Sequence, residues 1–207
     1  MNLANKLTLL RVLLVPVFII LMIINSFWAN ILALFVFIGA SITDYFDGVI
    51  ARKKNMITTF GIFLDPLADK LLVTSAFISF VGIYTLNIPA WMVICIIARE
   101  FIITGLRSIA ASKNVIIPAN MAGKVKTTSQ MIAIITILVI LVINSILTKF
   151  YFITPYELLD FKGWQQILGV ILIYAPYWLM LITTIFTLYS GISYLIIHKK
   201  IFIEQKN

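Results

Sequence analysis

The sequence contains one cysteine and one histidine among its 207 residues. The single cysteine, Cys95, cannot form an intramolecular disulfide, and it lies within an apolar run. Structural zinc sites are built from several Cys and His ligands, so one Cys95 and one His198 argue against such a site. Acidic residues are also scarce, with 8 against 16 lysines and arginines. No polar linker divides the chain, so we expect a single domain over residues 1–207.

Apolar residues dominate the composition of the chain. They make up 62% of the chain, and the mean hydropathy is +1.08. This is too apolar for a soluble domain and predicts an all-α, polytopic membrane protein. The net charge of +8 is then a topology signal and an attraction for anionic lipids and phosphates, and nucleic-acid binding is not needed to explain it. The N-terminus lacks a small-residue cleavage site, so we expect no cleavable signal peptide.

The apolar runs predict six transmembrane helices after an N-terminal interfacial amphipathic helix at residues 1–11. The expected spans are, approximately, residues 12–27, 31–54, 59–85, 90–111, 127–147 and 167–197. The last run is too long for one straight span, because at 1.5 Å per residue it would reach about 45 Å against an apolar core of about 30 Å. Either Pro176 bends it or its first third lies at the interface, so the path of residues 148–176 stays open.

The basic residues sort by side of the membrane. Six spans put both termini on one side, which would carry Lys6, Arg11, Arg52, Lys53, Lys54, Lys113, Lys124, Lys126, Lys199, Lys200 and Lys206. The other side would carry only Lys149 and Lys162, offset by Glu157 and Asp160. The positive-inside rule therefore predicts that both termini lie in the cytoplasm.

Four of the eight acidic residues lie within residues 44–69. On a helix, Asp44 and Asp47 are i, i+3 neighbours, and Asp65 and Asp69 are i, i+4 neighbours. If the two helices run antiparallel, the pairs can face each other, and their charges repel unless cations lie between them. Oxygen-only ligands suit Mg²⁺ or Mn²⁺, and two such ions would clamp a diphosphate. The alternative is that the aspartates stabilise helix ends or pair with lysines.

The stretch from Asp44 to Asp69 reads D-x2-D-G-x2-A-R-x8-G-x3-D-x3-D. This pattern resembles the signature of the CDP-alcohol phosphotransferases, with every spacing kept. The resemblance implies a membrane enzyme that moves a CMP-linked phosphatidyl group onto an alcohol. It makes Asp44, Asp47 and Asp65 the chief metal ligands. Asp69 is similar to the family's general base and would also approach the second ion.

The resemblance further implies contacts with the CDP group. The residues that it assigns to this role are Asn5, Thr8, Gly48, Ala51 and Arg52. For Asn5 and Thr8 the alternative is a solvated face of the interfacial helix, and for Arg52 it is a topology charge. Thr58 could reach the same pocket, although a helix-cap role explains it equally well.

A basic cluster forms the second candidate site. Its members are Arg99, Arg107, Lys124 and Lys126, at the cytoplasmic ends of two expected spans. Arginines in an apolar segment are unfavourable without anions, and Glu100 can pair with only one of them. A phosphate is the natural partner, because Arg offers two parallel hydrogen bonds and Lys a point charge. The alternative is that these side chains snorkel to lipid headgroups.

Residues 99–107 and 123–127 look like the same stretches of bacterial phosphatidylglycerophosphate synthases, a group within this family. That resemblance implies transfer from CDP-diacylglycerol to glycerol 3-phosphate by a homodimer in the bacterial cytoplasmic membrane, with a cytoplasmic active site. Another acceptor, such as inositol phosphate, serine or a lipid, is the nearest alternative. From other classes the alternatives are a divalent-cation transporter and a structural scaffold. A transporter should show inverted repeats, and we find none in the sequence.

Overall fold

The computed structural model describes residues 3–54, 59–112 and 121–203, with the side chains of residues 8–43, 70–112, 121 and 123–197. Within these ranges the chain forms six long helices and no strand, so the all-helical prediction is confirmed. The helices are α1 (Leu3–Ile24), α2 (Phe27–Lys54), α3 (Thr59–Val81), α4 (Ala90–Ser112), α5 (Met121–Ile146) and α6 (Trp164–Ile203). Short helical turns η1 (Tyr84–Leu86), η2 (Leu147–Tyr151) and η3 (Glu157–Asp160) lie in the connections.

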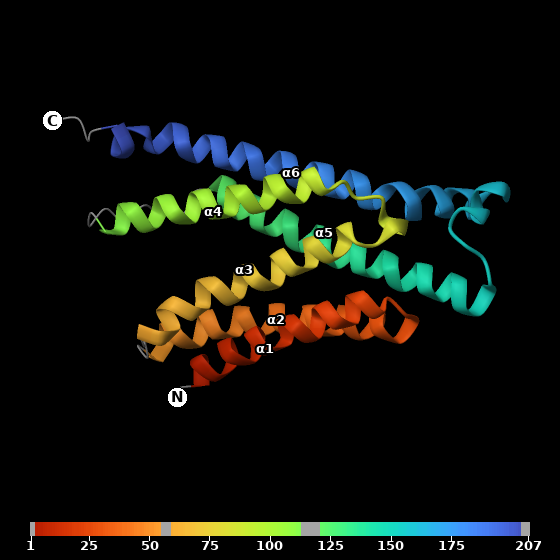
Figure 1. Ribbon diagram of the computed structural model, residues 1–207, viewed down its shortest axis with the longest axis horizontal. Helices are drawn as coiled ribbons and strands as arrows, with labels where there is room; N and C mark the ends of the chain where they lie inside the picture. Colours follow the sequence, from red (N-terminus) through yellow and green to blue (C-terminus); the bar gives the residue numbers. More distant parts are fainter. Residues whose placement is uncertain (1–2, 55–58, 113–120, 204–207) are drawn as a thin grey trace.

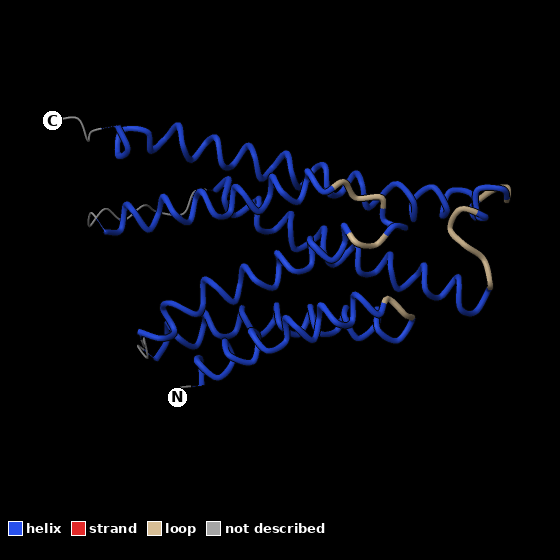
Figure 2. The backbone as a smooth tube through the Cα atoms, viewed as in Figure 1, coloured by secondary structure: helices blue, strands red, loops and turns tan. Residues whose placement is uncertain are grey.

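The helices run alternately up and down along one bundle. Figure 1 shows the start of α1 and the end of α6 at the same end of this bundle. The turns from α1 to α2, from α3 to α4 and from α5 to α6 lie at the other end, where Figure 2 shows them as tan loops. In the interior α1 packs on α2 and α3, while α5 packs on α2 and α6, and α4 packs on α6.

The turn between α1 and α2 comes earlier than the apolar runs predict. Asn25 has a left-handed φ of 42°, and its backbone N–H donates to the Leu21 carbonyl at 3.1 Å, which ends α1. The Ser26 hydroxyl accepts from the backbone N–H of Ala29 at 3.4 Å and caps α2. Asn25 and Ser26 are the polar residues that mark this boundary in the sequence, and the predicted span extends past them because Phe27 and Trp28 are again apolar.

The segment predicted as a separate interfacial helix, residues 1–11, is not separate. α1 runs as one helix from Leu3 to Ile24, and it packs along α3 as well as α2. Thr8 and Arg11 are only 2% exposed, so this part of the chain turns its polar side chains into the bundle. The solvated-face interpretation of Thr8 is therefore wrong.

Four phenylalanines, from α1, α2 and α3, belong to the buried core. Phe18 of α1 and Phe37 of α2 are fully buried, with ring centroids 5.9 Å apart. Phe77 and Phe80 of α3 belong to the same cluster, as do Met92 of α4, Ile137 of α5 and Met180 of α6. All six helices therefore share one core, in keeping with a single packed unit.

Large apolar side chains also cover the outside of the bundle. Each helix exposes at least two among its described side chains, for example Ile23, Phe35, Ile78, Ile94, Ile132 and Ile171. Among the described residues, Gly123–Tyr151 and Trp164–Ile197 are long and apolar enough to cross a membrane. The apolar stretches Thr8–Ile24, Phe27–Thr43 and Lys70–Val81 are shorter.

The sequence left the path of residues 148–176 open. In the structure α5 is extended by a helical turn, a connection then packs back against α5 and α6, and α6 begins at Trp164. Phe152, with a φ of 54°, follows the π-helical turn that extends α5. Leu158 is buried and packs with Ile140 and Leu172. At Gly169 an added Cβ would lie 2.9 Å from the Leu158 Cβ, so only glycine lets the loop approach so closely. α6 then continues as one helix with Pro176 inside it.

Candidate active site

The four motif aspartates lie on two consecutive helices. Asp44 and Asp47 belong to α2, and Asp65 and Asp69 belong to α3. The helical spacing within each pair therefore agrees with the expectation from the sequence. Their side chains lie outside the described part of the structure, so the facing of the two pairs stays a prediction. Four carboxylates form a donor set that suits oxygen-preferring divalent cations.

The residues assigned to CDP are spread over α1 and α2. Asn5 lies on α1, and Gly48, Ala51 and Arg52 lie on α2, all with side chains outside the described set. Thr58 falls outside the described residues altogether. Of the residues proposed for the nucleotide, Thr8 alone has a described side chain, and it points into the bundle interior rather than to the outside.

A pocket of about 600 Å³ lies between α3, α4 and α5. Its charged lining residues are Lys70, Arg99, Glu100, Arg107, Lys124 and Lys126. The structure thus brings all four members of the predicted basic cluster around one cavity. Arg107 lies near the end of α4 and Lys124 near the start of α5, so the pocket opens toward the end of the bundle that holds the chain termini.

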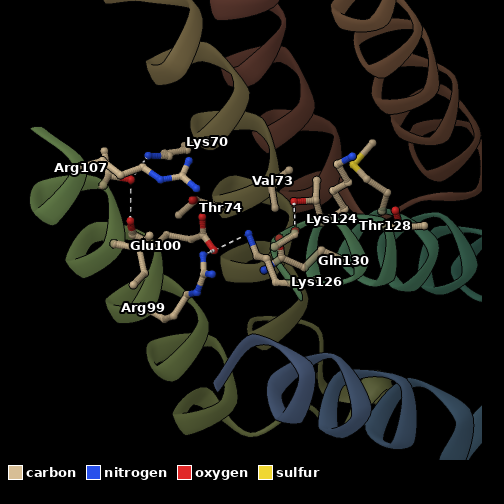
Figure 3. A pocket seen from close by; sticks show the side chains of 15 residues that line it. Lys70, Val73, Thr74, Arg99, Glu100, Arg107, Lys124, Lys126, Thr128 and Gln130 are labelled. Atoms are coloured by element: carbon tan, nitrogen blue, oxygen red, sulfur yellow. Dashed lines mark hydrogen bonds and ion pairs between the residues drawn. The ribbon is translucent and has the colours of Figure 1, made fainter. Parts of the chain in front are cut away.

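Glu100 organises one side of this pocket. Its carboxylate accepts a hydrogen bond from Arg99 Nη1 at 3.3 Å and forms an ion pair with Lys126. In Figure 3 the Glu100 carboxylate lies between these two cations. The side chains of Arg99 and Lys126 are only 12% and 7% exposed. This triad joins α4 to α5 and neutralises part of the buried positive charge.

Arg107 and Lys124 are arranged differently. Both are exposed, and neither forms an ion pair with a carboxylate of the described residues. The Arg107 guanidinium lies over the ring of Tyr194 on α6, 5.5 Å from its centroid, which is a cation–π contact. Among the residues that line the pocket, five cations face one carboxylate. The pocket therefore favours an anionic ligand.

Lys70 also lines the pocket, although it is not among the site residues predicted from the sequence. Its ammonium donates to the Thr104 hydroxyl, which itself donates to the Glu100 carbonyl at 2.7 Å. Lys70 directly follows Asp69, the last aspartate of the motif. That adjacency was the available signal, because it means that the pocket begins where the motif ends.

The pocket can hold a small phosphate-bearing molecule close to the motif helix. Guanidinium and ammonium groups from three helices converge on it, and hydroxyls of Thr74, Thr104, Thr127 and Thr128 add neutral hydrogen-bonding groups. In Figure 3 Lys70 and Arg107 lie toward one side of the cavity, and Lys124 and Thr128 lie toward the other. A bound anion would be contacted from opposite sides.

Comparisons with known proteins identify the family of this chain. The family model of CDP-alcohol phosphatidyltransferase matches residues 1–192. A Bacillus subtilis (strain 168) protein named CDP-diacylglycerol–glycerol-3-phosphate 3-phosphatidyltransferase is 48% identical over 149 residues, 66% of this chain and 76% of the relative. A Rickettsia typhi protein of the same name is 43% identical, over 64% of this chain and 74% of the relative. A Mycobacterium tuberculosis protein named probable phosphatidylglycerophosphate synthase is 44% identical, over 64% of each chain. The chain belongs to the CDP-alcohol phosphatidyltransferase family.

Proposed function

We propose that this chain transfers the phosphatidyl group of CDP-diacylglycerol to glycerol 3-phosphate, releasing CMP and phosphatidylglycerophosphate. Family membership supports the reaction class, and the names of the relatives support the acceptor. The observation on this molecule that carries the acceptor is the cationic pocket that begins at Lys70, directly after the motif. Glycerol 3-phosphate brings a dianionic phosphate, which serine and free inositol lack.

The motif would act on the other substrate. The acceptor hydroxyl attacks the phosphorus nearest the lipid, a new O–P bond forms, and the bond between that phosphorus and the CMP oxygen breaks. Asp69 takes the proton from the attacking hydroxyl. Asp44, Asp47 and Asp65, with Asp69 close by, would hold two Mg²⁺ or Mn²⁺ ions, which would bind the diphosphate of CDP-diacylglycerol and stabilise the charge on the departing CMP. Asn5, Thr8, Gly48, Ala51, Arg52 and Thr58 would surround the CDP group.

We further propose that the chain is a multi-pass membrane protein with six spans. The apolar exterior supports this, because a soluble protein rarely exposes such extended apolar surface. Lipid tails would remain in the bilayer while the CDP headgroup enters the end of the bundle that carries the termini and the pocket. That end carries most of the basic residues and would face the cytoplasm. A homodimer is the expected assembly by family resemblance.

The orientation has a direct test. In a Cys95→Ser background, a cysteine introduced at Lys53 is expected to resist a membrane-impermeant thiol reagent in intact cells and to react after the membrane is permeabilised. A cysteine at Lys162, in the loop at the opposite end of the bundle, is the matched control and should react in intact cells. Labelling of the Lys53 position before permeabilisation contradicts the proposed orientation.

The reaction is tested with the purified protein, CDP-diacylglycerol and Mg²⁺, scored for CMP release with each acceptor. We expect release with glycerol 3-phosphate and little with serine, inositol or unphosphorylated glycerol. Preferred turnover of inositol phosphate or of a lipid acceptor would keep the reaction class and replace the acceptor. No CMP release with any acceptor contradicts the proposed function as a whole.

A further inference from the structure

The helix α6 carries no sequence motif, yet one of its faces contacts side chains that line the cationic pocket. Thr187, Ser190, Gly191 and Tyr194 follow the spacing i, i+3, i+4, i+7 and therefore share one face. All four are buried, with Thr187 fully so and Ser190 and Tyr194 each 3% exposed. This face, Thr187–Tyr194, packs where α6 crosses α4 and α5.

The Arg99 side chain packs against the centre of this face, at Ser190 and Gly191. Its Nη2 donates to the Ser190 hydroxyl at 2.8 Å, while its Nη1 donates to Glu100. A Cβ added at Gly191 would lie 3.0 Å from Arg99 Cγ and 3.6 Å from its Nε. The Cγ belongs to the root of the arginine side chain, so it cannot swing aside as the tip of a flexible chain would. An alanine at Gly191 would therefore require the Arg99 side chain to move by a few tenths of an ångström from its present position between Ser190 and Glu100.

Two more pocket residues touch the same face. The ring of Tyr194 supports the Arg107 guanidinium, at 5.5 Å from the ring centroid. Gln130 Nε2 donates weakly to the Thr187 hydroxyl at 3.5 Å, and that hydroxyl donates to the Thr183 carbonyl at 2.7 Å. Residues of both α4 and α5 that line the cavity are thus held by side chains of α6.

We propose that Ser190, Gly191 and Tyr194 are positioning residues. They hold the guanidinium groups of Arg99 and Arg107 where these groups can bind the phosphate of the acceptor. A displacement of Arg99 would also affect the position of Lys126, because Glu100 forms ion pairs with both residues. This inference rests on the proposed function, since it assigns the pocket to the acceptor. Its consequence is that the C-terminal helix sets acceptor affinity without contacting the acceptor.

The first test is Gly191→Ala. We expect the KM for glycerol 3-phosphate to rise roughly tenfold, with kcat and the KM for CDP-diacylglycerol changed less than about twofold. Alanine has a higher helix propensity than glycine, so a general loss of α6 stability is not the expected cause. The matched control is Gly39→Ala on α2, where an added Cβ meets no atom within 4 Å. It should leave all three constants unchanged.

A double mutant separates displacement of Arg99 from a general structural defect. Arg99→Ala removes the side chain that the new Cβ would strike, so adding Gly191→Ala to it should have no further effect on the KM for glycerol 3-phosphate. Additive losses in the double mutant overturn the proposed route through Arg99. An unchanged KM in Gly191→Ala alone overturns the role of Gly191.

The second contact is tested through Tyr194. Tyr194→Phe keeps the ring beneath Arg107, so its KM for glycerol 3-phosphate should stay within about twofold of the parent, whereas Tyr194→Leu should raise it roughly tenfold. Tyr189→Leu, at an exposed tyrosine of the same helix, should change nothing. Equal effects of Phe and Leu at Tyr194 overturn the support of Arg107 by the ring. If the parent protein itself releases no CMP, the proposed function fails rather than this inference.

Discussion

Exchange of Asp69 for asparagine is expected to lower turnover of CDP-diacylglycerol by about 10²- to 10⁴-fold, the usual contribution of a general base. Asparagine has nearly the same shape as aspartate, but it is neutral and cannot take the proton of the attacking hydroxyl. The lipid substrate should still bind, because Asp44, Asp47 and Asp65 retain their charges. The measurement is CMP release under single-turnover conditions beside binding of CDP-diacylglycerol.

The informative comparison is with the other aspartates. Asp44→Asn and Asp65→Asn should abolish activity and also weaken the affinity for Mg²⁺ or Mn²⁺, because each removes a charged ligand. Asp69→Asn should shift the metal dependence less than either of them. Near-normal turnover in Asp69→Asn would show that another group takes the proton, and an unchanged metal requirement in Asp44→Asn would remove that residue from the ligand set.

The second large effect is expected at Arg107. Truncation to alanine should raise the KM for glycerol 3-phosphate far more than the KM for CDP-diacylglycerol. A charge-assisted hydrogen bond contributes about 1.5–3 kcal/mol, which corresponds to roughly ten- to two-hundred-fold in acceptor affinity. Arg107 is exposed into the pocket and pairs with no carboxylate of the described residues, so its guanidinium is available to an incoming phosphate. Steady-state kinetics with each substrate varied in turn measure the effect.

Two variants bracket the interpretation of Arg107→Ala. Arg107→Lys keeps the positive charge but not the planar guanidinium with its two parallel N–H donors. It should therefore raise the KM for glycerol 3-phosphate less than Arg107→Ala does. Lys162→Ala removes a positive charge from the opposite end of the bundle and should leave both constants unchanged. If Arg107→Ala instead raises mainly the KM for CDP-diacylglycerol, Arg107 belongs to the nucleotide-lipid subsite. Equal activity with unphosphorylated glycerol would remove the need for a phosphate subsite.

The existence of the helices could be predicted from the local pattern of apolar residues, whereas the residues at which α1 begins and ends could not. Apolar runs and the basic residues after them locate all six helices, although the helix ends differ from the predicted spans by up to nine residues at the start of α1. The predicted span runs past Asn25 and Ser26, because two polar residues inside a long apolar run do not by themselves distinguish a turn from a continuing span, whereas the left-handed φ of Asn25 and the capping hydroxyl of Ser26 do. The predicted break after Arg11 fails for a related reason. A polar residue can remain in a continuous helix when a neighbouring helix covers it, as α3 and α2 do for α1.

The basic half of the site was predictable because charge is unfavourable in an apolar segment. Arg99, Arg107, Lys124 and Lys126 stand out for that reason, and the structure gathers them around one cavity. Lys70 did not stand out, since it follows an aspartate and is readily interpreted as that residue's partner. Only the packing of α3 beside α4, which brings Lys70 to Thr104, shows that it lines the same pocket.

By itself, the sequence determined the helical class, the family, and which side chains carry the unusual charge. These are local properties: apolar runs, aspartates at fixed spacing, and cations where an apolar segment would exclude them. The tertiary structure alone decided that α6 backs the pocket. Contacts such as Arg99 with Ser190 join segments about ninety residues apart, and they depend on how closely two helices approach. At Gly191 the absence of a Cβ leaves room for the Arg99 side chain, and one glycine in an apolar helix gives no periodic pattern from which this contact could be predicted.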